Sequence, residues 1–226
     1  MVQDAFNDFR TTGEPPLDIV LPPSVTAVYD TIKAFEEQQG RSCKGGFYFG
    51  GVFTSILRDE APRDIDIAVH APELYELADL WSERQSRTAG NYKERQEIRE
   101  DMEFFMDQMF PYSSRIFFNE ENLTSVRTCP TIGPCFLVTA TSVIEGRATP
   151  VDVLFMKDEI DPLKMLIRTE DAPIRKVGFF TETGEYTFHK KFPDHAERWV
   201  FEPTDPDTIK EDILEKAREK GMQIVL

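Results

Sequence analysis

The sequence predicts an α+β fold in which helices pack on a mixed β-sheet. Several segments carry apolar residues at three- and four-residue spacing, as amphipathic helices do, and others alternate apolar with polar residues, as strands do. Two pairs of alternating segments are joined by short turns and predict β-hairpins. No internal repeat or low-complexity linker interrupts this pattern, so we expect one compact unit.

The first elements follow from local patterns. Residues 1–22 are rich in proline towards their end, and we expect an irregular N-terminal lead-in. Ser24 is the expected cap of a helix that runs to Gln39, because Val25, Val28 and other apolar residues recur at helical spacing and a glycine follows. The next expected elements are a strand at 45–49, a short helix at 52–57 and a strand at 64–69.

The rest of the chain continues the alternation of helices and strands. Residues 72–110 are expected to form a helical insertion with two charged helices, 72–86 and 91–109. A strand at 115–118 is expected next, and then two hairpins, made of 135–144 with 150–155 and of 176–180 with 186–189. Thr204 or Asp205 opens an expected C-terminal helix that Gly221 closes, so 204–226 is treated as a separate C-terminal element after a domain at 23–203.

Composition limits the function. The chain has 226 residues, 41 Asp+Glu against 26 Lys+Arg and a net charge of −15, which disfavours a protein that wraps long DNA or RNA. No apolar run is long enough to cross a membrane, and the acidic N-terminus does not resemble a signal peptide. Three cysteines are an odd count for a disulfide framework, so we expect a cytoplasmic protein.

Two carboxylates form the most informative motif. Asp64 and Asp66 lie two residues apart on an apolar strand and therefore point to the same face. Two like charges in an apolar setting are costly unless a cation lies between them, and Mg²⁺, or Mn²⁺ in its place, accepts carboxylate and phosphate oxygens. Asp152 is an isolated acid in another apolar strand and is the best candidate for a third ligand in a two-metal site.

The glycine pair Gly50–Gly51 precedes the carboxylate motif by 12 residues and a short expected helix. Glycines at such a turn let a phosphate group approach the backbone closely. The combination predicts a site for a nucleoside triphosphate and metal. Plainer interpretations are an exposed strand edge for Asp64 and Asp66, an exposed hairpin acid for Asp152, and a tight turn for the glycine pair.

Residues 50–67 resemble the head-domain signature GGxxRDxLLGRxPxDxDI of CCA-adding enzymes and bacterial poly(A) polymerases, members of the DNA polymerase β-like nucleotidyltransferase superfamily. The spacing from Gly-Gly to Asp-x-Asp is the same. The resemblance implies the nucleotidyltransferase fold, a mixed β-sheet with helices packed on it, for residues 23–203. It implies that Gly50 and Gly51 contact the triphosphate, that Asp64 and Asp66 bind metal ions, and that Asp152 is the third acid.

A weaker resemblance links residues 170–179 to the RRDFTINAMAY segment of the same family, which lies near the nucleotide; Asp171 and Ile174 match it closely. The chain also departs from the family, because Thr54–Ser55 replaces an Arg-Asp pair and residues 58–60 replace a Leu-Gly-Arg turn. The candidate nucleotide-binding residues are Gly50, Gly51, Thr54, Ser55, Arg63, Asp171 and Arg175.

The sequence thus predicts a two-metal nucleotidyltransferase that moves a nucleoside monophosphate from ATP or CTP to an acceptor hydroxyl and releases pyrophosphate. The acceptor is an RNA 3′ end, a small molecule or a protein. The loss of the Arg-Asp pair supports an alternative, a catalytically inactive binding or scaffold protein of the same fold. A third alternative on the same site is an NTP hydrolase or an enzyme that makes cyclic nucleotides.

Two further clusters invite functional interpretations. Cys129 and Cys135 have no second pair at zinc-site spacing, so a structural loop is the favoured interpretation. His189 and His195 flank two lysines, which fits either a phosphate contact or a solvated loop.

Overall fold

The structure is a computed structural model that describes residues 7–87, 91–109, 128–129, 133–169 and 171–226. The strand expected at 115–118 lies outside these residues. Among the described residues, no helix has the length and apolar character needed to cross a membrane.

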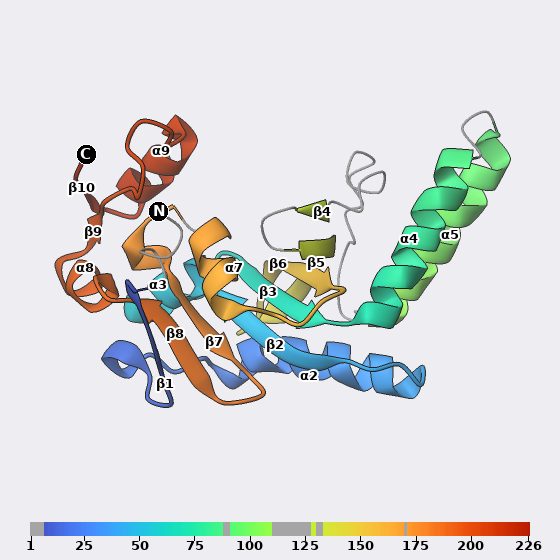
Figure 1. Ribbon diagram of the computed structural model, residues 1–226, viewed down its shortest axis with the longest axis horizontal. Coiled ribbons are helices and arrows are strands. Elements are labelled where there is room, and N and C mark those ends of the chain that lie inside the picture. Colours follow the sequence, from blue (N-terminus) through green and yellow to red (C-terminus); the bar gives the residue numbers. More distant parts are fainter. Residues whose placement is uncertain (1–6, 88–90, 110–127, 130–132, 170) are drawn as a thin grey trace.

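A mixed eight-stranded sheet forms the centre of the molecule (Figure 1), with the strand order β1-β8-β7-β2-β3-β6-β5-β4. Its pairs are antiparallel except for β3 and β6, which run parallel. The strands are β1 (Phe9–Thr12), β2 (Lys44–Phe49), β3 (Ile65–His70), β4 (Thr128–Cys129), β5 (Gly133–Ile144), β6 (Arg147–Met156), β7 (Val177–Phe180) and β8 (Glu185–His189). The mixed sheet and the helices on it confirm the predicted α+β class.

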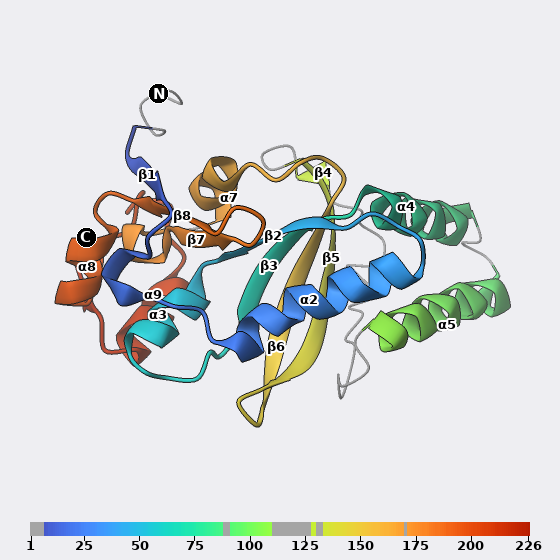
Figure 2. The same cartoon turned by 90° about the horizontal axis from the view of Figure 1, so that it is seen from below.

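Helices cover the sheet and extend from it. Helix α2 crosses one face of the sheet, and α4 and α5 form a long pair that projects beyond it (Figures 1 and 2). The α-helices are α2 (Pro23–Gln38), α3 (Gly51–Leu57), α4 (Pro72–Arg87), α5 (Tyr92–Met109), α7 (Pro162–Thr169), α8 (Phe192–Arg198) and α9 (Glu211–Glu219). Two short 3₁₀ helices are η1 (Pro16–Asp18) and η2 (Pro173–Arg175), and a small parallel sheet pairs β9 (Val200–Phe201) with β10 (Gln223–Ile224).

Expectations about both chain ends were wrong in part. Residues 9–12, placed in an irregular lead-in, form β1 because they pair with β8, in a register that joins Thr11 to Thr187, 176 residues further along the chain. Strand pairing between such distant segments leaves little trace in a short local pattern.

The C-terminal helix ends before Gly221, with φ at 71°, as predicted, but it begins at Glu211 and not at Thr204 or Asp205, because residues 204–210 contain a turn. The chain then enters β10, which was not predicted.

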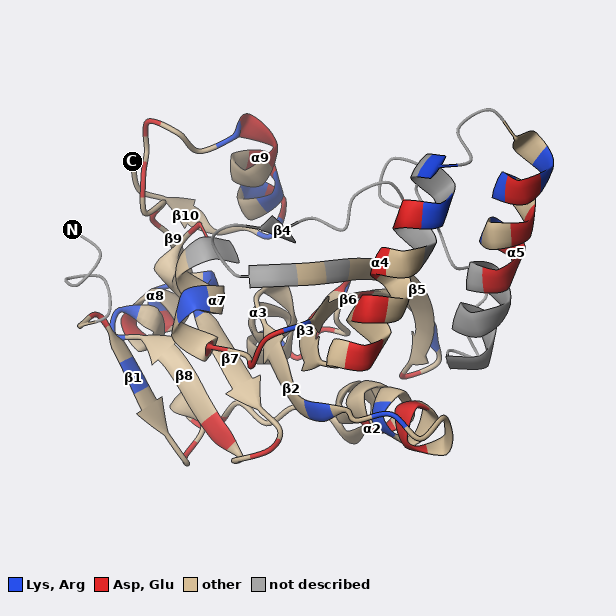
Figure 3. Cartoon of the chain, turned by 45° about the vertical axis from the view of Figure 1, so that its right-hand side comes forward, with Lys and Arg blue, Asp and Glu red and all other residues tan. Residues whose placement is uncertain are grey.

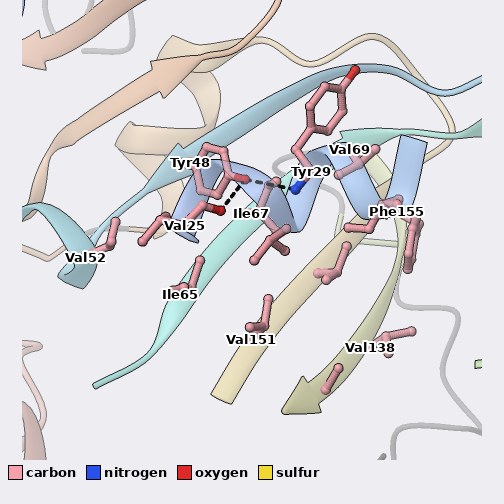
Figure 4. Close-up of a cluster of buried hydrophobic side chains, with 14 of the residues drawn as sticks. Val25, Tyr29, Tyr48, Val52, Ile65, Ile67, Val69, Val138, Val151 and Phe155 are labelled. Atoms are coloured by element: carbon pink, nitrogen blue, oxygen red, sulfur yellow. Dashed lines mark hydrogen bonds between the residues drawn. The ribbon is translucent and has the colours of Figure 1, made fainter. Parts of the chain in front are cut away.

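The core between α2 and the sheet depends on Tyr48, which is fully buried. Its hydroxyl accepts a hydrogen bond from the Tyr29 backbone N–H at 3.0 Å and donates to the Val25 carbonyl at 2.9 Å (Figure 4). Those two backbone groups are the pair that an uninterrupted helix would join, so the side chain inserts into the α2 ladder and fixes α2 on the sheet.

We expect Tyr48→Phe to lower the free energy of unfolding by about 1–2 kcal/mol, because the hydroxyl is lost from a buried network while the ring still fills its space. Urea denaturation followed by circular dichroism measures this difference. Tyr92→Phe is the matched control, since Tyr92 is 81% exposed. Equal stability of the Tyr48→Phe variant and the wild type would contradict the proposed link between α2 and the sheet.

At the outer edge of the sheet, the Phe9 ring packs edge-on against the His189 ring, with 5.4 Å between the ring centroids. Burial, and then the charge of Lys176, lower the pKa of His189 from 6.5 to about 4. The unfolded chain therefore binds more protons than the folded protein between these two values, and stability falls as the pH drops through that window.

We expect the wild type to lose on the order of 1 kcal/mol of stability between pH 7 and pH 5 from this group. His189→Asn keeps an acceptor near the Lys191 backbone N–H, which donates to His189 Nδ1 at 3.1 Å, and removes the titration. Its loss of stability on acidification should be smaller than that of the wild type, although not zero, because burial also lowers the pKa of His195. Identical slopes of stability against pH would contradict the assignment.

Candidate active site

The parallel pairing of β3 with β6 brings two acids together, with Asp66 directly opposite Asp152. Ile65 and Ile67 point into the core beneath α2, so the alternation of the strand sends Asp66 to the opposite face. Asp64, two residues earlier, is exposed just before β3 begins, whereas Asp66 and Asp152 are partly buried. The structure therefore brings all three predicted acids to one end of the central strands.

Thr139 on β5 extends this row and was missed by sequence reasoning. It pairs with Asp152 across the β5–β6 hairpin, and its hydroxyl donates a 2.6 Å hydrogen bond to Asp152 Oδ1. The hairpin register contains the signal that could have found it, because a tight turn at Glu145–Gly146 fixes which residue faces Asp152. Thr139 thus orients one oxygen of the Asp152 carboxylate.

The carboxylates interact electrostatically. Burial, and then the charges of Asp64 and Asp152, raise the pKa of Asp66 to about 7, against the opposing effect of Arg175. Within the described residues, no three His, Cys, Asp or Glu side chains converge closely enough to hold one ion by themselves. This donor set still fits Mg²⁺, which usually takes one or two carboxylates and completes its shell with phosphate oxygens and water.

The glycine pair lies beside the acids. Gly50 has φ at 75° and ψ at −134°, a backbone conformation that only glycine adopts readily, and it directs the chain from β2 into α3. A Cβ on Gly51 would lie 3.1 Å from Asp64 Oδ1, so the absence of a side chain there lets the backbone approach the carboxylate. The predicted proximity of the glycine pair to the acids is therefore a property of the fold.

Thr54 and Ser55 occupy the positions where the related signature has Arg-Asp. Both are buried, and their hydroxyls donate to the Gly51 carbonyl at 2.8 and 3.4 Å. Thr54 also lines the cavity next to Asp64, whereas Ser55 is not among the residues of that lining. These hydroxyls thus stabilise the first turn of α3.

A cavity of about 250 Å³ opens between Asp64 and the C-terminal segment. Its lining residues are Gly51, Thr54, Arg63, Asp64, Arg175, Phe201, Ile213, Lys216, Ala217, Glu219, Lys220 and Met222. Arg63 and Arg175 were predicted from the sequence, whereas the residues from 201 onwards were not. They were missed because helix α9 reaches this site only through tertiary packing.

Asp171 does not line this cavity. It borders a different one, of about 350 Å³, with Lys176, Thr204 and six other residues. Its backbone carbonyl accepts a hydrogen bond from the Thr204 N–H at 2.7 Å, which fixes the chain leading towards α9. A direct role for Asp171 at the nucleotide therefore remains a prediction, and the structure gives it a place next to the second cavity.

No family model matches the sequence, and no curated protein matches it. Solved structures do match. The complex of a CCA-adding enzyme with CTP has a TM-score of 0.50 and 14% identity, over 96% of this chain and 42% of that chain. The chain has the nucleotidyltransferase fold. The Thermotoga maritima CCA-adding enzyme complexed with tRNA matches at a TM-score of 0.49 and 14% identity, over 96% of this chain and 43% of that one.

This chain spans less than half the length of the CCA-adding enzymes it matches, at 42% and 43% of those two chains. At 14% identity the likeness concerns the fold.

We expect Asp66→Asn to raise the free energy of unfolding by about 2 kcal/mol at pH 8 in the presence of EDTA. The folded protein holds a proton on Asp66 up to about pH 7, whereas the unfolded chain releases it near 3.8, so stability is lost as the pH rises through that window. The amide is neutral throughout, so the gain should vanish near pH 4. Thermal unfolding at both pH values measures it.

Asp79→Asn is the control for this prediction, because Asp79 is exposed on α4. Added Mg²⁺ should raise the melting temperature of the wild type more than that of Asp66→Asn. An Asp66→Asn variant less stable than the wild type at pH 8 in EDTA would contradict the described repulsion between the carboxylates.

Proposed function

We propose that this protein is a Mg²⁺- or Mn²⁺-dependent nucleotidyltransferase that moves a nucleoside monophosphate from an NTP to an acceptor hydroxyl and releases pyrophosphate. The observation that carries the proposal is the in-register pairing of Asp66 with Asp152 on parallel strands, with Asp64 beside them. Partly buried like charges such as Asp66 and Asp152 are costly, and their position beside a cavity is characteristic of a functional site.

Asp64 and Asp66 are the residues proposed to hold the metal ions, with Asp152 completing the shell of one of them. When bound, the ions neutralise the charge of the phosphates and lower the pKa of the attacking hydroxyl. Thr139 occupies Asp152 Oδ1 through its 2.6 Å hydrogen bond, so Oδ2 remains for a ligand or for the proton of the acceptor hydroxyl. The role of Thr139 is therefore to position Asp152.

The phosphate side of the site is proposed to be formed by Gly50, Gly51, Arg63 and Arg175. The close approach of Gly51 to Asp64 leaves the backbone open on the cavity side. Arg63 and Arg175 line the same cavity as Thr54, which stands where the family signature has an arginine, and supply positive charge there. This substitution favours a working phosphate site in spite of the missing Arg-Asp pair.

The acceptor and the preferred NTP are open parts of the proposal. Two of the matched structures are CCA-adding enzymes in complex with CTP and with ATP, and these two nucleotides are the first to test. The net charge of −15 opposes a long nucleic-acid contact and favours a small molecule, a protein, or an RNA 3′ end held locally.

We expect the wild type to transfer label from α-³²P-labelled ATP or CTP to an acceptor in a mixture of total RNA, small alcohols and protein, and to release pyrophosphate. Asp64→Ala/Asp66→Ala should reduce transfer by at least a thousandfold, since each removed carboxylate takes away a proposed metal ligand. Asp79→Ala on α4 is the matched control and should leave the rate unchanged. Gel analysis and a pyrophosphate assay measure both products.

The same experiment separates the alternatives. Transfer that survives in the double variant would refute the assignment of the acids. NTP binding without any transfer would favour the inactive binding protein, and chromatography of the products would reveal a hydrolase or a maker of cyclic nucleotides by free nucleotide or cyclic product.

A further inference from the structure

Four basic side chains gather around the cavity next to Asp64, although the chain as a whole carries a net charge of −15. Arg63 precedes β3, Arg175 ends η2, Lys216 lies in α9, and Lys220 directly follows α9. They come from three separate segments, and the only acids that line the same cavity within the described residues are Asp64 and Glu219. The basic wall, which we define as Arg63, Arg175, Lys216 and Lys220, therefore gives this cavity a net positive lining on a protein of net negative charge.

Three of these cations, Arg63, Lys216 and Lys220, are not used in ion pairs among the described residues. In the part of the chain that the structure describes, the side chains of Arg63, Lys216 and Lys220 make no hydrogen bond and no ion pair within 4.0 Å. This differs from other basic residues, such as Lys191, which lies 2.9 Å from a Glu202 oxygen. Basic groups that converge on a cavity and lie beyond ion-pair distance of its acids are suited to bind a multiply charged anion.

Lys220 shows that the group is electrostatically coupled. Burial lowers the pKa of its ammonium, Asp64 acts in the opposite direction, and Arg175 and Arg63 lower the pKa further. Its ammonium thus feels the candidate metal-binding acid and both arginines while it remains beyond ion-pair distance of Asp64. The cavity therefore offers phosphate oxygens two kinds of partner, the basic side chains and the metal ions proposed at Asp64.

The C-terminal segment is packed so that the two lysines keep this position. Leu214, Ala217 and Met222 form a small core with Ile174 and Phe201, which joins α9 to η2 and β9. The indole N–H of Trp199 donates to the Lys220 carbonyl at 2.9 Å.

The same tryptophan ring stacks under the Arg58 guanidinium, whose central carbon lies 5.0 Å from the ring centroid, just beyond the end of α3. Helix α9 is therefore anchored both to the helix after the glycine pair and to the segment that carries Arg175. Figure 3 shows that α9 carries basic as well as acidic residues.

We propose that Lys216 and Lys220 bind the β- and γ-phosphates of the incoming nucleoside triphosphate, and then the pyrophosphate after transfer. This inference rests on the proposed function and adds the C-terminal helix to a site that the sequence motif places wholly in the sheet domain. The cavity of about 250 Å³ suits a phosphate chain, because basic side chains and Asp64 line it together with the apolar Phe201, Ile213 and Met222.

The test is calorimetric titration of the full chain with inorganic pyrophosphate in the presence of Mg²⁺. Lys216→Gln/Lys220→Gln should weaken binding at least tenfold and flatten its salt dependence, because two positive charges are lost from the wall. Lys216→Arg/Lys220→Arg should bind within about threefold of the wild type, since the charges are kept. Lys210→Gln is the matched control, because Lys210 begins the same helix but lines the other cavity.

A short RNA oligonucleotide without a triphosphate, titrated in parallel, distinguishes the two possible sources of phosphate. If the glutamine pair weakens binding of the oligonucleotide while pyrophosphate binds as in the wild type, the proposal is overturned. Pyrophosphate binding unchanged in a folded glutamine variant, with the circular dichroism and melting temperature of the wild type, overturns it as well.

The test also separates this inference from the proposed function. Loss of transfer in Asp64→Ala/Asp66→Ala, together with unchanged pyrophosphate affinity in the lysine variant, would refute the role of the lysines and leave the enzyme assignment standing. Pyrophosphate binding that depends on the two lysines, in a protein that transfers no nucleotide, would support the anion site and refute the transferase.

Discussion

The parallel pairing of β3 with β6 is the constraint on which the rest of the site depends. It places Asp66 beside Asp152 at the same level of the sheet, and the even spacing of side chains along a strand then puts Asp64 on the same side. A register shift of one residue would move the carboxylates to the face that packs under α2, where Val151 and Ile67 are fully buried. The apolar partners of these acids therefore fix the register, and the register brings the acids together.

The repulsion among Asp64, Asp66 and Asp152 destabilises the folded protein. Burial and the neighbouring carboxylates raise the pKa of Asp66 to about 7, while a single hydroxyl, that of Thr139, satisfies one oxygen of Asp152. Arg175 reduces this cost only in part, because burial and the two neighbouring carboxylates outweigh its effect on the pKa of Asp66. The acids next to a basic cavity are the basis on which we propose a transferase that binds divalent cations and phosphates together.

The site is built from two parts of the chain, the sheet domain and the segment that contains helix α9. The glycine pair, Asp64 and Asp66 come from one continuous stretch of about 17 residues, which also supplies Arg63, whereas Asp152 comes from β6. The remaining charge and the apolar end of the cavity come from Arg175 and from the C-terminal segment, which a separate small core holds against η2. The sheet domain and the C-terminal helix thus each contribute one wall of a shared cavity.

The sequence by itself determined the elements with strong local patterns: the helices at α2, α4 and α5, the two hairpins, and the carboxylates on one face of β3. Local periodicity is sufficient there because hydrophobic burial imposes a period of 3.6 or 2. Only the tertiary structure decided that residues 9–12 complete the sheet, that Thr139 faces Asp152, and that Lys216 and Lys220 line the same cavity as Asp64. These contacts join segments that lie far apart in the chain, and their energies depend on register and packing, which no local pattern records.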